Sequence, residues 1–71
     1  MTVNNYFYDG QMLKAIYPGD MPSHRVGEVG CKSIIVVMES GQMDLVPWAI
    51  AVGEDGTRVK YNLALCESVE I

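Results

Sequence analysis

The 71-residue chain has little of the chemistry that builds metal or catalytic sites. It holds one histidine, His24, and two cysteines, Cys31 and Cys66, which lie far apart in the sequence. These residues lack the paired spacing of a zinc site, so we expect no bound metal and no other cofactor. The Gly-x-Ser-x-Gly motif of hydrolases and the glycine-rich nucleotide motifs are absent as well. The sequence therefore predicts a protein without catalytic residues that is not an enzyme.

Basic residues are also few. Five lysines and arginines stand against nine aspartates and glutamates, for a net charge of −4. Proteins that bind nucleic acid by neutralising phosphates have the opposite balance, so we expect no direct nucleic-acid partner. Hydrophobic runs are short, because Ile34–Met38 holds five residues and a membrane helix needs about 20. The first residues show no signal-peptide pattern, so we expect a cytoplasmic protein that does not bind a membrane. In a reducing cytoplasm, we expect Cys31 and Cys66 to be free.

The chain has enough apolar residues for one small core. Its hydrophobic content is 49%, and its length predicts a single domain over residues 1–71. A domain of this size is marginally stable, and oligomerisation is a common supplement where disulfides and metals are lacking. Ile34–Met38 is apolar on both faces, and so small a chain does not easily cover both. The sequence therefore predicts a homo-oligomer.

The strongest secondary-structure signals predict four strands, at residues 32–39, 45–53, 57–61 and 65–71. Turn residues at Ser40–Gln42 and Glu54–Gly56 separate the first three. Consecutive strands joined by short turns form an antiparallel sheet. We therefore expect a mainly β fold, a small antiparallel β-meander with barrel-like or sandwich-like packing.

The N-terminal part leaves two structures open. Residues 11–17 fit a strand that pairs with residues 3–8 through the turn at Asp9-Gly10. They also fit a short helix with Asp9 as its N-cap, and their residue types favour a helix. Seven residues form a helix only with tertiary support. The expected fold thus includes either an N-terminal hairpin or one short helix.

Residues 18–30 are the irregular part of the chain, with two prolines and three glycines. Long loops of this kind are often functional, and this one holds His24 and Arg25. A guanidinium presents a planar fork of donors that matches phosphate oxygens. We therefore expect Arg25, assisted by His24, to bind a small anionic ligand. The alternative is a solvated loop with a short edge strand at residues 25–27.

Two aromatic residues, Trp48 and Tyr17, complete the predicted ligand-binding set, because aromatic rings stack on planar ligands. The alternative for Trp48 is a core position beside Tyr61 of the next strand. Alternation along residues 45–53 puts three side chains on each face of the strand: Trp48, Ile50 and Val52 on one, and Pro47, Ala49 and Ala51 on the other.

A series of short motifs runs through the second half of the chain: Gly41-Gln42-Met43, Val46-Pro47-Trp48, Asp55-Gly56, Tyr61-Asn62 and Val69. This series resembles small uncharacterised proteins encoded in bacteriophages and prophages. The resemblance covers residues 34–71 and leaves the N-terminal half unmatched.

The resemblance implies a compact phage accessory protein in the cytoplasm of the host cell. Small acidic phage proteins of this kind commonly inhibit host systems without catalysis. We therefore expect a counter-defence protein that sequesters a small, nucleotide-like anionic signal molecule. The alternatives are an inhibitor that binds a host defence protein complex, as anti-CRISPR proteins do, and a structural phage component.

Overall fold

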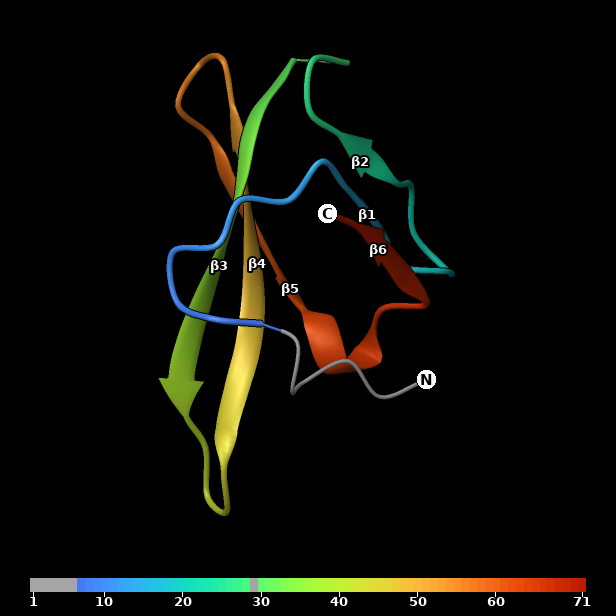
Figure 1. Ribbon diagram of the computed structural model, residues 1–71. Coiled ribbons are helices and arrows are strands. Elements are labelled where there is room, and N and C mark those ends of the chain that lie inside the picture. The colour runs from blue at the N-terminus through green and yellow to red at the C-terminus, as the bar shows by residue number, and fades with distance from the viewer. Residues whose placement is uncertain (1–6, 29) are drawn as a thin grey trace.

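The computed structural model describes residues 7–28 and 30–71, which form two antiparallel three-stranded sheets (Figure 1). One sheet has the order β3 (Cys31–Ser40), β4 (Leu45–Gly53) and β5 (Arg58–Asn62). The other has β1 (Ala15–Tyr17) between β2 (His24–Arg25) and β6 (Ser68–Glu70). The predicted mainly β fold with small antiparallel sheets is confirmed.

The β3–β4–β5 meander matches the first three predicted strands to within one residue at each end. Pro47 lies inside β4, although proline cannot donate to a ladder. The Gly53 N–H donates to the Thr57 carbonyl of the facing strand at 2.7 Å. Backbone groups alternate in direction along a strand, so the nitrogens of residues 51, 49 and 47 also point toward β5. Trp48 is the last β4 residue paired with β5. Pro47 lies beyond that point, so its missing N–H breaks no ladder bond.

Residues 11–17 follow the turn at Asp9-Gly10 and cross from one sheet to the other (Figure 1). The N–H groups of Gly10 and Leu13 donate to β3 carbonyls at 2.7 and 2.9 Å, and β1 then begins at Ala15. The helix interpretation of residues 11–17 is therefore wrong, and the strand interpretation holds for Ala15–Tyr17 only. The partners of β1 are β2 and β6, while most of the predicted pairing segment, residues 3–8, lies outside the described residues.

The last predicted strand leaves the meander. Leu63–Leu65 form a short 3-10 helix, η2, and the Asn62 side chain accepts a hydrogen bond from the Ala64 N–H at 2.9 Å. This turn carries the chain to the second sheet, where β6 pairs with β1 and Val69 lies opposite Ile16. The prediction of a four-stranded meander is corrected to a three-stranded one, because β6 completes the hydrogen bonding of β1.

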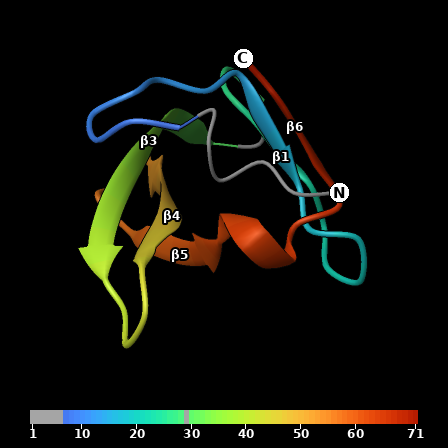
Figure 2. The same cartoon turned by 60° about the horizontal axis from the view of Figure 1, so that its bottom comes forward.

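The two sheets face each other across one core, and η2 joins β5 to the second sheet (Figure 2). The described core residues are Phe7, Leu13, Ile16, Cys31, Ile34, Val36, Ala49, Ala51 and Leu63. On β4 the inward face carries small alanines, which let the second layer pack closely. Trp48, Ile50 and Val52 lie half-buried on the opposite, outer face. The two predicted faces of β4 are therefore separated as expected, and Trp48 is not a core residue.

Candidate functional site

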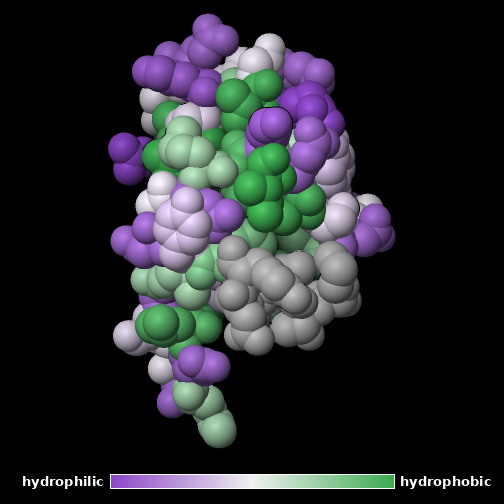
Figure 3. Space-filling model, in the orientation of Figure 1, coloured by the Kyte–Doolittle hydropathy of each residue, from purple (hydrophilic) through white to green (hydrophobic). Residues whose placement is uncertain are grey.

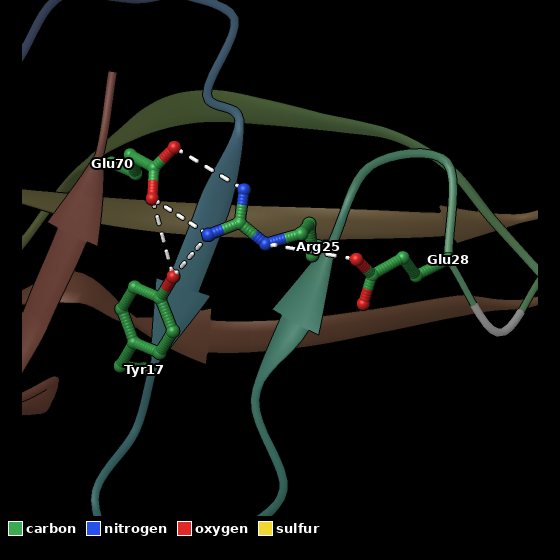
Figure 4. Close-up of polar contacts among 4 residues, drawn as sticks. All are labelled: Tyr17, Arg25, Glu28 and Glu70. Atoms are coloured by element: carbon green, nitrogen blue, oxygen red, sulfur yellow. Dashed lines mark hydrogen bonds and ion pairs between the residues drawn. The ribbon is translucent and has the colours of Figure 1, made fainter.

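Arg25 lies at the centre of a polar cluster that joins the three strands of the second sheet (Figure 4). Its Nη1 donates to Glu70 Oε1 at 3.2 Å and its Nη2 to Glu70 Oε2 at 2.7 Å. Nη2 also donates to the Tyr17 hydroxyl at 2.7 Å, and Nε lies 3.9 Å from a Glu28 oxygen. Arg25 is therefore part of the edge strand β2 and not of an open loop. The alternative prediction placed a short edge strand at residues 25–27, whereas the strand covers His24–Arg25 and residues 26–27 form a turn.

The guanidinium donors of Arg25 are already hydrogen-bonded to the Glu70 carboxylate. The hydrogen bonds and charge of Arg25 lower the pKa of Glu70, and Glu70 raises the pKa of Arg25. Both groups are thus held in their charged forms at neutral pH. An incoming phosphate must displace Glu70 before it can use the same donors.

His24 points to the other side of β2 and contacts β5. Its Nε2 lies 2.7 Å from the Tyr61 hydroxyl, and the two ring centroids are 5.2 Å apart. This contact joins an edge strand of one sheet to an edge strand of the other. His24 therefore marks the place where the two sheets meet beside a cleft.

The cleft has a volume of about 470 Å³ and lies between His24 and the β4–β5 hairpin. Apolar groups and glycine backbone form most of its lining, and three polar side chains of the hairpin stand at its rim. The lining residues are His24, Gly30, Cys31, Ala51, Val52, Gly53, Glu54, Asp55, Thr57 and Val59.

The rim of the cleft is acidic. Asp55 accepts hydrogen bonds from the hydroxyl and the N–H of Thr57, and these bonds lower its pKa. Glu54 precedes it in the same turn and is exposed. Burial raises the pKa of the Cys31 thiol, which donates to the Ser33 carbonyl. The cleft therefore presents negative charge at its rim and a neutral thiol in its wall.

Trp48 lies away from this cleft, on the outer face of the β3–β4–β5 sheet. The Lys60 ammonium lies 4.6 Å from the centre of the Trp48 ring and donates to Glu39 Oε2 at 2.9 Å. The long Lys60 side chain thus covers part of the indole. A base cannot stack on that covered area unless Lys60 moves.

The four predicted ligand residues therefore lie in three places. Arg25 and Tyr17 share the cluster with Glu70, His24 lines the cleft, and Trp48 lies on the outer face. Sequence reasoning missed Glu70 as the partner of Arg25, since the two are 45 positions apart. It also treated Glu54–Gly56 only as a turn, although this turn forms the rim of the cleft.

Cys31 and Cys66 are free, as expected. Within residues 7–28 and 30–71, no group of three or more histidine, cysteine or acidic side chains could hold a metal ion. The same residues contain no helix of the length and hydropathy needed to cross a membrane.

Comparisons with protein-family models, curated proteins and solved structures give no match. The fold and the cleft thus define a class, a small two-sheet antiparallel β protein with an acidic-rimmed cleft.

Proposed function

We propose that this protein is a non-enzymatic binding protein whose cleft takes up a small molecule with a cationic or N–H-bearing group. The observation that carries the proposal is the cleft of about 470 Å³, whose lining combines apolar side chains with the exposed acidic residues Glu54 and Asp55. Clefts of this size with a few polar groups are typical of small-molecule sites. Among the described residues that line it, none is a lysine or arginine. Its charge therefore favours a cationic ligand over an anionic one.

The chemistry of the cleft supports binding over catalysis. A nucleophilic cysteine needs a lowered pKa, and burial raises the pKa of Cys31. A base that activates a thiol is hydrogen-bonded to it, whereas the described ring contact of His24 is with the Tyr61 hydroxyl and the Cys31 thiol donates to the Ser33 carbonyl. His24 is thus well placed to form the wall of a binding site.

The role we propose in a phage accessory protein is counter-defence in the host cytoplasm, by sequestering a small host signal molecule. The expected ligand was nucleotide-like and anionic. Glu54 and Asp55 repel phosphate at the rim, and Arg25 is paired with Glu70. The geometry therefore favours a nucleoside-like or amine-bearing ligand over a phosphorylated one.

Thermal unfolding with three probes tests this proposal: tryptamine, adenosine and adenosine monophosphate. A ligand at one hundred times its Kd stabilises a protein by about 2.7 kcal/mol, so binding is easily detected. We expect tryptamine and adenosine to raise the melting temperature more than adenosine monophosphate does. A larger rise with the monophosphate would contradict the acidic-cleft proposal and support the anionic ligand on Arg25.

A matched pair of variants locates the binding. Glu54→Gln removes one charge from the rim and should weaken tryptamine binding by about threefold, the effect of a modest exposed charge pair. Glu67→Gln makes the same change at an exposed position that does not line the cleft, and it should bind normally. Equal weakening in both variants would show that net charge, and not the rim, controls the affinity.

A second candidate function, inhibition of a host defence protein, is favoured by the β3–β4 hairpin. The hairpin extends beyond the rest of the molecule (Figures 1 and 3), whose longest dimension, with the hairpin included, is 35 Å. Met43 near its tip is 96% exposed, and Leu45 beside it is also exposed. Exposed flexible methionines adapt well to partner surfaces.

Affinity capture from a bacterial extract tests this second function. We expect Met43→Ser to release a captured partner protein, and Met21→Ser, at another exposed methionine, to retain it. Retention of the partner by Met43→Ser would exclude the hairpin tip as its binding surface.

A further inference from the structure

The free edge of β5 is a second surface with its own recognition chemistry. β5 is the last strand of its sheet, and its residues Arg58, Val59 and Lys60 are all exposed. Val59 faces inward beside the cleft, opposite buried Ala51, and is still 42% exposed. The second sheet therefore does not cover this edge.

The hydrogen-bonding pattern of the β4–β5 ladder shows which backbone groups of β5 point toward its free edge. The bond from Gly53 N–H to the Thr57 carbonyl makes 51–59 and 49–61 the bonded pairs of the β4–β5 ladder. Val59 and Tyr61 thus direct their backbone groups toward β4. Arg58 and Lys60 direct theirs to the free edge, where no backbone partner occurs among residues 7–28 and 30–71.

The side chains beside this edge select the partner. Arg58 and Lys60 lie on the outer face, and Arg58 forms no ion pair with any described residue. A second copy of β5 fits poorly in the antiparallel register centred on Val59, because that register sets Arg58 of one copy against Lys60 of the other. Like charges in directly opposed positions destabilise a sheet, whereas opposite charges stabilise it.

We propose that β5 binds an extended peptide segment of a partner protein that alternates acidic and apolar residues. The segment adds a strand to the β3–β4–β5 sheet, as in other cases of β-strand addition. Its backbone bonds the free groups of Arg58 and Lys60. On the outer face its carboxylates lie beside Arg58, which has no ion pair with a described residue, and beside Lys60, whose ammonium is also paired with Glu39. Its apolar side chains lie on the inner side, beside Val59 and the mouth of the cleft.

Amide hydrogen exchange with the peptide acetyl-Glu-Val-Glu-Val-Glu-amide tests this proposal. We expect the peptide to slow exchange at the Arg58 and Lys60 amides by about tenfold near saturation, since new backbone bonds protect those groups. Exchange at the Val59 and Tyr61 amides should change little, because they already bond to β4. The lysine analogue of the peptide should protect none of them.

Two variants complete the test. Arg58→Glu should weaken binding of the acidic peptide by about tenfold, since it replaces an attractive cross-strand pair with a repulsive one. Lys32→Glu makes the same charge change at an exposed position of β3 and should leave binding unchanged. Equal effects of the two variants, equal binding of the lysine analogue, or no protection of the Arg58 and Lys60 amides would each overturn the proposal.

Discussion

Arg25 shows how one long-range partner changes the role of a residue. As a solvated loop side chain it would contribute little to stability, and replacing it with alanine would be nearly neutral. In the structure it bonds Glu70 and Tyr17 and joins three strands. We therefore expect Arg25→Ala to lower the melting temperature, and Arg25→Lys to restore only part of it, because an ammonium lacks the planar fork.

The pH dependence of stability reports the same ion pair. Arg25 lowers the pKa of Glu70 from its ordinary value of 4.5, so the folded state favours the charged carboxylate. This stability is present above that ordinary value and is lost as the pH falls through the lower folded pKa. In urea titrations, the stability difference between the wild type and Arg25→Ala should shrink between about pH 5 and pH 2. A difference that stays constant over this range would contradict the pairing.

The candidate site could be predicted only in part at this scale. Loop composition drew attention to His24, which the structure places in the lining of the cleft. The sequence predicted free donors on Arg25 because nothing local to it marks Glu70 as its partner. The role of Glu54–Gly56 as the rim of the cleft could not be predicted for a different reason. These residue types are typical of a hairpin turn whether or not a cleft lies beside it.

Among the elements, η2 decides where the last strand goes. The Asn62 side chain caps this short helix by accepting the Ala64 N–H, and Leu63 within it is fully buried. We expect Asn62→Ala to lower the free energy of unfolding by about 1 kcal/mol, the usual effect of losing such a cap. Equilibrium urea denaturation measures the change. Asn62→Asp keeps the acceptor oxygen and should retain most of the stability.

The strands that the sequence predicted correctly are those with local signals. The β-branched run of β3 and the hairpin turn after β4 lie within or beside the elements they specify. The pairing of β6 with β1 has no such signal, because it depends on where η2 directs the chain. For residues 11–17 the helix propensity of single residues is overridden by backbone bonds to β3 and β6.

For the whole molecule, the outer face of the β3–β4–β5 sheet bears on self-association. Cross-strand neighbours such as Ile35 and Ile50 are half-buried there and lie side by side. We predict that the protein forms at least a dimer at micromolar concentration by covering this face. Light scattering over a dilution series measures the mass, and Ile50→Lys should yield the monomer. A monomeric mass for the wild type at every concentration would exclude this prediction.

The pairing of β1 with β6 also sets an order of events during folding. The partner strand of β1 ends at Glu70, more than fifty residues further along the chain. The β3–β4–β5 hairpins connect neighbours in the chain and form early, whereas contacts over long sequence separations form slowly. Until residues 68–70 reach β1, that strand lacks one of its two neighbours. The apolar inner face of the β3–β4–β5 sheet is then exposed, and such a partly folded chain is the state most prone to aggregate.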